Sequence, residues 1–436
     1  MRMRVSLPEA LKEVPDAPPQ KIRLKLRLAT PMIGGGVESG QPDEDWPIRA
    51  SAIRGHLRWW WRAVHGFSLS PAEMRKQEAQ LWGWAGRIDE DGKRVDLVRE
   101  SLVQIVVAPA PDSFECGKEC RSSMRIDQCD SNPCLKRTGD CQSIPGYVKD
   151  VLLQDRRKPS MTVLRKGEFT LTITLNPINP INPISPGEEL LKSVFSSLRA
   201  WLLFGGIGAR TRRGAGCLSI VQSNLKGIEP NQLNLDSKQP FCEPAQVPTL
   251  YHATIFKGAA CDDAPAAWRK AINLWRAFRK GIDVRNGLED GLTDDETKGA
   301  SGWPDWETSL DASTNSNVVS ISKASLGLPY TLYCPITRKE IKYTLGDIST
   351  RMGSCVITKP VFVSGHWHPA WICLNAPKFE DERVTSSTAL NGARISTQYC
   401  DMPYSPIDEP EDETWSDLFD LVRYFAVESG WSEQKL

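Results

Sequence analysis

The clearest pattern along the chain is a strict alternation of apolar and basic residues over 21–29, KIRLKLRLA. Apolar side chains fall on one face and basic side chains on the other, as in a strand that is buried on one side. A second alternation covers 168–175, and shorter apolar runs at 101–108 and 217–223 also predict strands. The first strand therefore carries a cationic outer face, made of Lys21, Arg23, Lys25 and Arg27.

Helical spacing of apolar residues predicts helices over 48–67, 71–82 and 187–204. Ser51 is a candidate cap for the first of these helices, because its hydroxyl can accept a bond from a free backbone N–H. Together with the strands, the first half has the order strand, helix, strands, helix, strand. This order is typical of an α+β fold of the split β-α-β kind.

A second α+β unit follows a polar, proline-containing stretch at 224–247. It opens with a strand over 250–256 and a helix over 265–280. We therefore expect two domains, 1–225 and 245–436. The remaining elements predicted in the second domain are strands at 318–321, 329–334, 354–363 and 370–374 and a closing helix at 414–428.

Charge and hydropathy narrow the classes of protein to consider. The 436 residues include 54 basic and 54 acidic side chains, so the net charge is zero. A strongly basic protein that coats nucleic acid is excluded, and any nucleic-acid binding must come from local basic patches. The sequence has no apolar run of membrane-spanning or secretory length, so we expect no membrane association and a cytoplasmic protein.

The first long helix carries a row of arginines. Arg54, Arg58 and Arg62 are four residues apart, and each step of four drifts by only about 40° around a helix. The helix contains no acid, and Arg49 extends the row. We therefore expect these arginines to contact phosphates. Of the three adjacent tryptophans, 59–61, we expect two in the core; a base-stacking platform is the alternative.

The loop GGIGARTRRGAG, 205–216, combines glycines with three arginines. Glycines let backbone N–H groups approach an anion, and guanidinium groups donate forked bonds to phosphate oxygens. The loop lacks the GK[ST] ending of a P-loop and the GxGxxG spacing of a dinucleotide site, so a phosphodiester backbone fits better than a nucleotide. A basic surface loop after a helix end remains the alternative.

Three motifs together resemble the RAMP superfamily of CRISPR proteins: TPMIGGG (30–36), PIRASAIRGHLRWWWRAV (47–64) and the loop 205–216. More closely, they resemble the first RAMP subunits of type III-B Cmr effector complexes. Segments 268–279, 326–329 and 351–361 extend the resemblance into the second half. The resemblance implies two ferredoxin-like, RRM-like domains and a role in antiviral defence.

The resemblance also implies what the chain binds. It implies a non-catalytic subunit that contacts guide RNA and target RNA near the guide's 3′ end, beside other Cmr-type subunits. The residues expected to bind RNA are Gly34, Gly35, Gly36, Arg49, Arg54, Arg58, Arg62, Gly205, Gly206, Gly208, Arg210, Arg212 and Arg213. A RAMP endoribonuclease that processes guide RNA with His56 or His65 as general acid or base is the alternative. Because no recognisable active site is present, we expect no enzymatic activity.

The segment 111–142 departs from the family pattern and reads as a Cys-rich insertion in the first domain. Clustered thiols in a reducing compartment suit tetrahedral Zn²⁺, so a structural zinc site is expected. The spacings of three, eight, four and six intervening residues include no CxxC pair, and a reduced loop or a redox-labile cluster remains open. Five candidates exceed the four ligands that zinc needs: Cys116, Cys120, Cys129, Cys134 and Cys141.

Overall fold

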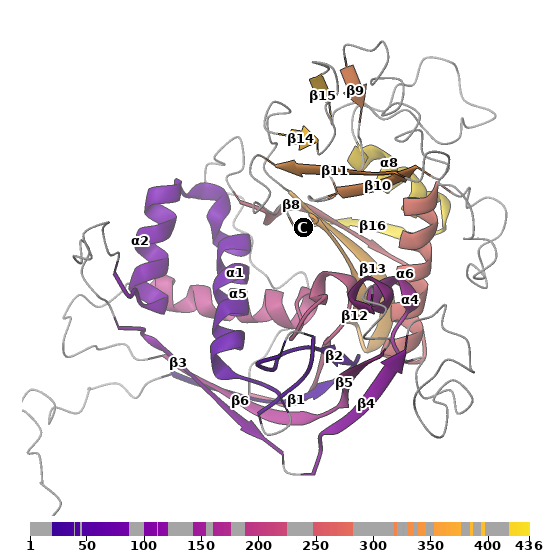
Figure 1. Cartoon of the computed structure of the whole chain (residues 1–436). Helices are drawn as coiled ribbons and strands as arrows, with labels where there is room; N and C mark the ends of the chain where they lie inside the picture. Colours follow the sequence, from indigo (N-terminus) through magenta and orange to yellow (C-terminus); the bar gives the residue numbers. More distant parts are fainter. Residues whose placement is uncertain are drawn as a thin grey trace, which may run out of the picture. The chain divides into compact units, whose positions relative to one another are not determined.

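The computed structural model divides the chain into two units (Figure 1). Unit 1 comprises 1–118, 161–209 and 216–247, and unit 2 comprises 119–160, 210–215 and 248–436. In the described part, no helix is long and apolar enough to cross a membrane. The structure describes residues 20–38, 40–43, 46–86, 100–110, 112–120, 143–153, 160–175, 188–224, 247–281, 318–320, 326, 330–334, 339–345, 353–375, 384–386, 394–396 and 418–436.

Unit 1 is built on a four-stranded sheet with the order β3-β6-β1-β7, in which all neighbours are antiparallel. Helix α1 follows β1 and helix α5 follows β6 along the chain, which gives the split β-α-β arrangement. The elements are β1 (Gln20–Leu28), α1 (Ala50–His65), β3 (Val103–Pro109), β6 (Glu168–Leu175), α5 (Glu188–Phe204) and β7 (Leu218–Ser223).

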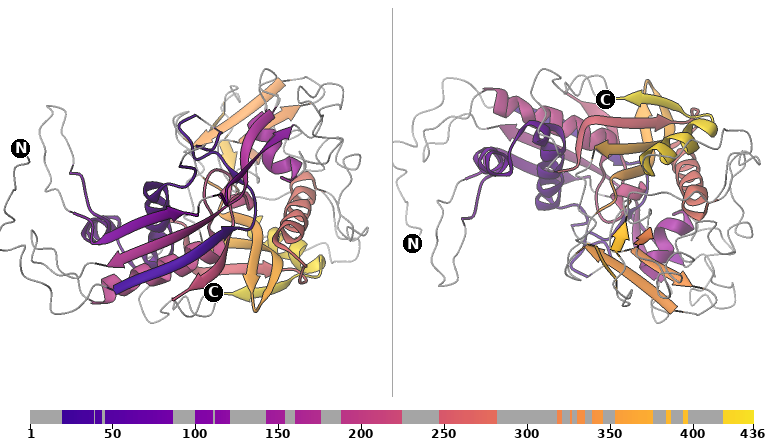
Figure 2. Two further views of the ribbon diagram at one scale, coloured as in Figure 1. Left: turned by 90° about the horizontal axis from the view of Figure 1, so that it is seen from below. Right: turned by 90° about the horizontal axis from the view of Figure 1, so that it is seen from above.

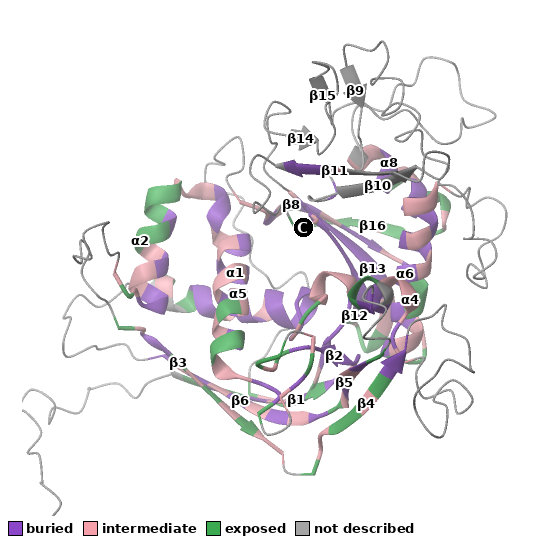
Figure 3. Cartoon of the chain, viewed as in Figure 1, coloured by how far each residue is buried: buried purple, intermediate pink, exposed green. Residues whose placement is uncertain are grey.

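Alternation along β1 decides which face of this sheet is covered. Leu24 and Leu26 are fully buried, whereas Arg23 and Arg27, which point the other way, are exposed. Helices α1 and α5 pack on the apolar face, and both carry buried residues (Figure 3). Trp61 of α1 is fully buried. The basic face of the strand is left toward solvent, as its sequence predicts.

Unit 2 repeats the same strand order, β12-β13-β8-β16, with antiparallel pairings. Its core gathers Trp275, Phe278, Trp371 and Phe425. Asp263 caps α6 by accepting a 2.7 Å bond from the Ala266 N–H. The elements are β8 (Thr249–Lys257), α6 (Ala264–Lys280), β12 (Val356–Val363), β13 (His366–Asn375), α8 (Leu418–Glu428) and β16 (Ser432–Lys435).

Smaller elements complete the described chain. A three-stranded sheet has the order β2-β5-β4, a second has the order β10-β11-β14, and β9 pairs with β15 in parallel. Helix α2 begins with a capping box between Ser70 and Glu73. The bounds are β2 (Met32–Ile33), α2 (Pro71–Trp82), β4 (Glu115–Cys120), α4 (Gly146–Lys149), β5 (Ser160–Lys166), β9 (Val318–Ser320), β10 (Tyr330–Cys334), β11 (Lys339–Leu345), β14 (Val384–Ser386) and β15 (Arg394–Ser396), with 3-10 turns η2 (Gly66–Ser68), η4 (Asp150–Leu153) and η5 (Thr211–Arg213).

The predicted α+β class is confirmed, and three details differ from the sequence-based expectation. Helix α1 begins two residues earlier than a Ser51 cap requires, because its N-cap is Arg49, without a side-chain cap bond. The start of the predicted Cys-rich insertion is the regular strand β4, while 121–142 lies outside the described residues. Segments 119–160 and 210–215 group with unit 2 rather than with the first half of the chain.

Candidate nucleic-acid interface

Within unit 1, the loop after β1 lies beside both ends of the glycine-rich loop 205–216. The Ala209 N–H donates to the Ile33 carbonyl over 2.7 Å, and Ile33 and Ala209 form an isolated β-bridge. The Gly216 N–H donates to the Pro31 carbonyl over 2.8 Å. The fold thus joins the loop after β1 to the loop after α5, although Ile33 and Ala209 are 176 residues apart along the chain.

Glycines in these loops allow the protein backbone to approach itself. Gly208 has φ +80°, and a Cβ atom there would lie 2.5 Å from the Ile33 carbonyl oxygen. A Cβ atom on Gly36 would lie 2.7 Å from the Gln41 carbonyl oxygen. Within the described chain, the N–H groups of Gly206 and Gly208 have no backbone partner. Gly206 is buried, whereas Gly208 is half-buried and can offer its N–H group to an anion.

The arginine row on α1 has an acid partner from another helix. Arg58 Nε donates to Glu78 Oε1 over 2.7 Å, and Arg62 Nη1 donates to the same oxygen over 2.8 Å. Glu78 lies on α2 and is buried, while about a third of each arginine side chain is exposed, 32% and 33%. The expectation of an arginine row without an acid partner is therefore wrong at Arg58 and Arg62. Together with Glu78, these two arginines carry one net positive charge.

The other two arginines of this group also have protein partners. Arg54 donates to the Ser101 hydroxyl and to the Val103 carbonyl. Burial lowers the pKa of Arg54, and repulsion from Arg58 is a smaller cause of the same shift. Arg49 pairs with Asp43 over 2.6 Å, beside the first glycine loop. The row is thus held in place by the protein, rather than extended freely into solvent.

The tryptophans beside the arginines belong mostly to the core. Trp60 and Trp61 are buried, as expected for two of the three, and Trp59 packs edge-on against Trp60 with ring centroids 4.8 Å apart. The Trp61 indole donates to the Ser193 hydroxyl on α5 over 2.7 Å. These contacts fix α1 against α5.

His65 is part of the same α1–α5 contact. Its Nε2 lies 3.3 Å from the Ser193 carbonyl, which can only accept, so this nitrogen carries the proton. Burial lowers the pKa of His65 to about 4, opposed by the bond to Ser193. Burial also lowers the pKa of His56. His65 is therefore neutral near pH 7 and is engaged as a structural donor.

In unit 2, two of the loop arginines bind carbonyl groups of the chain at β12. Arg212 Nη1 donates to Ser354 O over 2.9 Å, and Arg213 Nη1 donates to Val356 O over 2.7 Å. The Arg213 guanidinium also lies 5.0 Å from the centre of the Trp275 ring. Burial, with repulsion from neighbouring arginines, lowers the pKa of Arg213 to about 10.

Arg210 differs from its two neighbours. Its φ of +60° is unusual for a residue with a side chain, and its buried Nε has no hydrogen-bond partner in the part of the chain that the structure describes. Burial lowers the pKa of Arg210, opposed by the facing Tyr147. Among the three loop arginines, Arg210 is thus the one with a buried donor that finds no partner within the described chain.

The expected zinc ligands can be tested only in part, because Cys129, Cys134 and Cys141 lie outside the described residues. Cys116 and Cys120 both lie on β4, four residues apart, so their Cα atoms are about 13 Å from each other. Two thiolates on one Zn²⁺ can be no more than about 4.6 Å apart. One zinc ion can therefore take at most one of this pair. Among the described residues, no group of three or more His, Cys, Asp or Glu side chains could hold a metal.

Comparison with known families gives the class of this protein. The RAMP superfamily model matches residues 25–219, which include all three motifs named above. This region therefore belongs to the RAMP superfamily, and the resemblance to that superfamily is confirmed. Among curated proteins, none matches the chain.

Three solved structures that resemble this chain are of Cmr proteins. Cmr1 from Pyrococcus furiosus, in its apo form, is 16% identical, with a TM-score of 0.42, over 86% of this chain and 93% of that one. A chain of the type III-B Cmr-beta complex bound to cognate target RNA is 14% identical, with a TM-score of 0.39, over 84% of this chain and 95% of that one. A chain of Cmr-beta bound to cognate target RNA and AMPPnP in the presence of single-stranded DNA is 15% identical, with a TM-score of 0.40, over 83% and 96%.

Proposed function

We propose that the chain is a non-catalytic RNA-binding subunit of a type III-B, Cmr-type, RNA-guided CRISPR effector complex. In this role it contacts guide RNA and target RNA near the 3′ end of the guide, beside other Cmr-type subunits, in antiviral defence. The observation that carries the proposal is the RAMP superfamily match over 25–219, within which the structure joins the two glycine-rich motifs.

The chemistry of the joined loops supports RNA-backbone binding. The half-buried Gly208 N–H group can donate to a phosphate oxygen, and the excess charge of Arg58 and Arg62 over Glu78 is available on α1. Contacts of this kind do not read base identity. A subunit that must accept any guide sequence needs contacts with this property.

Binding to RNA by the full-length chain tests the proposal. A fluorescein-labelled single-stranded RNA should bind with an affinity that falls as salt rises, by a slope near −0.7 for each phosphate contacted. The chain should also assemble with Cmr-type partner subunits and retain guide RNA on purification. A chain that neither binds RNA nor enters such a complex would overturn the proposal.

The same RNA tests the endoribonuclease alternative. Because His65 is neutral and holds Ser193, we expect no cleavage in the presence of EDTA. A metal-independent cut that disappears in His56→Ala or His65→Ala would support processing of guide RNA instead.

We also propose that one structural Zn²⁺ orders the Cys-rich segment. A short polar segment cannot build an apolar core, and thiolate ligation would replace it. The geometry of β4 limits the ligands to Cys129, Cys134, Cys141 and one of the pair Cys116 and Cys120.

A further inference from the structure

The sheet of unit 1 has an open face that the glycine loops do not use. Helices α1 and α5 pack on its apolar side, and Figure 2 (left) looks onto the other side, where the strands of unit 1 lie in front of the helices. The side chains of Lys25 and Arg27 on this face are 43% and 57% exposed. These cations lie on β1, which is paired on both edges and therefore occupies the interior of the sheet.

The register of the sheet sets the cations beside a row of hydroxyl groups. Every second residue of β1 faces a threonine or Glu168 of β6, and the partners on β3 are small or neutral. Successive cations on the strand are about 7 Å apart. The cross-strand rows are Lys21–Thr174–Gln104, Arg23–Thr172–Val106, Lys25–Thr170–Ala108 and Arg27–Glu168.

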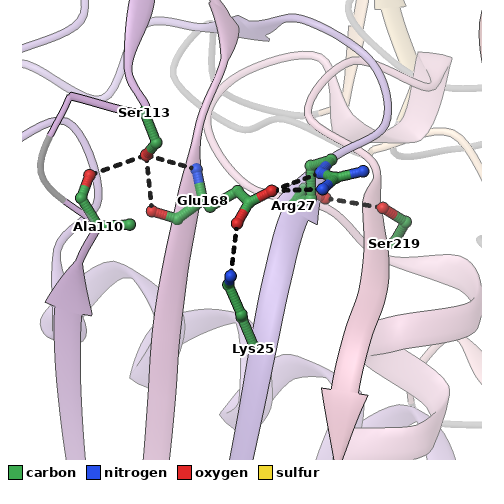
Figure 4. Close-up of polar contacts among 6 residues, drawn as sticks. All are labelled: Lys25, Arg27, Ala110, Ser113, Glu168 and Ser219. Carbon is green, nitrogen blue, oxygen red and sulfur yellow. Dashed lines mark hydrogen bonds and ion pairs between the residues drawn. The ribbon is translucent and has the colours of Figure 1, made fainter.

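The charge of this face is strongly unbalanced. Glu168 is the acid in these rows, and it pairs with both Lys25 (2.9 Å) and Arg27 (2.6 Å), as Figure 4 shows. Bonds from these two side chains lower the pKa of Glu168, so it stays ionised at neutral pH. Within the described chain, Lys21 and Arg23 have no ion-pair partner. Four cations and one anion leave three net positive charges along one strand.

The arrangement fits the backbone of a single-stranded nucleic acid. Evenly spaced cations flanked by threonine hydroxyls supply the two kinds of side chain that most often contact phosphates. The rows contain no aromatic side chain, so bases cannot stack on this sheet as they do on RRM sheets. A protein partner would need an apolar or aromatic centre to its interface, and the exposed apolar side chain in these rows is a single valine, Val106.

We propose that the open sheet face of unit 1, centred on Lys21 and Arg23 and flanked by Thr170, Thr172 and Thr174, is a second RNA surface that binds the phosphate backbone without sequence preference. The proposal rests on the proposed function, because RNA is the polyanion that such a subunit meets. It adds residues that none of the three RAMP motifs contains.

The experiment measures binding of the full-length chain to a fluorescein-labelled 30-nucleotide oligo(U) RNA by anisotropy across a salt series. Lys21→Gln with Arg23→Gln should weaken binding about tenfold and reduce the salt slope by about 1.4, which is two contacts at about 0.7 each. The matched control is Arg75→Gln with Lys76→Gln on the exposed side of α2, which removes the same charge from unit 1. The control should change the affinity less than twofold.

A second variant predicts the opposite sign, which unfolding cannot mimic. Glu168→Gln removes the acid from these rows and releases Lys25 and Arg27, so RNA should bind about threefold to tenfold more tightly. If Lys21→Gln with Arg23→Gln (the sheet pair) changes the RNA affinity no more than the α2 control does, the proposed RNA surface on the sheet is wrong. It is also wrong if Glu168→Gln does not tighten RNA binding.

Further outcomes separate this inference from the proposed function. A wild-type chain that fails to bind RNA overturns both proposals. A chain that binds RNA, loses affinity in Arg210→Asn and is unaffected by the sheet pair overturns only the sheet surface. Loss of polyglutamate binding without loss of RNA binding in the sheet pair would identify an acidic-protein site and would also overturn it.

Discussion

At the scale of single residues, position in the loop 205–216 does not decide what an arginine does. Arg213 is occupied by the Val356 carbonyl and the Trp275 ring, whereas Arg210 has a left-handed backbone and an Nε without a partner among the described residues. The sequence shows both as members of one basic loop. Only the tertiary partners, which lie 62 and 143 residues away from Arg213 along the chain, distinguish a structural arginine from an available one.

Arg210→Asn and Arg213→Ala should therefore have opposite effects. Asn tolerates the left-handed backbone, so Arg210→Asn should leave stability within about 0.5 kcal/mol and weaken RNA binding roughly tenfold. Arg213→Ala loses a charged hydrogen bond and a cation–π contact, so it should lower the free energy of unfolding by about 2–3 kcal/mol. Urea denaturation and RNA anisotropy measure the two effects. The reverse pattern would make Arg213 the RNA ligand.

His65 gives a prediction about pH. Its pKa is about 4 in the folded chain, against 6.5 as a reference, so only the unfolded chain binds the proton between these values. Stability is unaffected above pH 6.5 and falls as the pH drops toward 4, by on the order of 2–3 kcal/mol. His65→Gln should flatten this part of the stability curve, measured by urea denaturation at pH 4.5 and 7. An equally steep loss in the variant would contradict the burial of His65.

At the scale of elements, the sequence predicts what local periodicity encodes. Alternation over 21–29 and helical spacing over 187–204 match β1 and α5 to within a residue or two. Strands β4 and β16 were missed because ECGKEC and SEQK show no apolar alternation. Such strands form because they pair with strands elsewhere in the chain. The periodicity of a single segment carries no information about that pairing.

The pairing of α1 with α2 could not be predicted for the same reason, although both helices were. Glu78 is buried and accepts from two arginines, so Glu78→Gln should lower the free energy of unfolding by about 1–3 kcal/mol. If the arginine row contacts RNA, the same variant should bind RNA more tightly. Glu189→Gln, on the exposed side of α5, is the control for both measurements. No change in stability would mean that the two ion pairs do not hold α2.

At the scale of the whole molecule, one strand order is built twice from unlike sequences. β3-β6-β1-β7 and β12-β13-β8-β16 correspond strand for strand, and each first helix buries tryptophan, Trp61 in α1 and Trp275 in α6. The glycine-rich motifs of the candidate site could be found from the sequence, because each motif is a run of neighbouring residues. The partners of the arginines could not, because the fold alone brings them together.

The zinc proposal also makes a prediction for the whole chain, and strand geometry sharpens it. The untagged chain, purified under reducing conditions, should contain about one equivalent of zinc by elemental analysis. Because Cys116 and Cys120 cannot reach one ion together, at least one of Cys116→Ser and Cys120→Ser should keep the full equivalent. The double variant should lose zinc affinity, as should Cys134→Ser. Chelation should leave the four-stranded sheets of unit 1 and unit 2 folded, because none of the five candidate cysteines lies on a strand of either sheet. Far-ultraviolet circular dichroism would show this. Loss of zinc in both single variants would mean that β4 does not persist in the metal-bound chain, and absence of zinc from the wild type would remove the site.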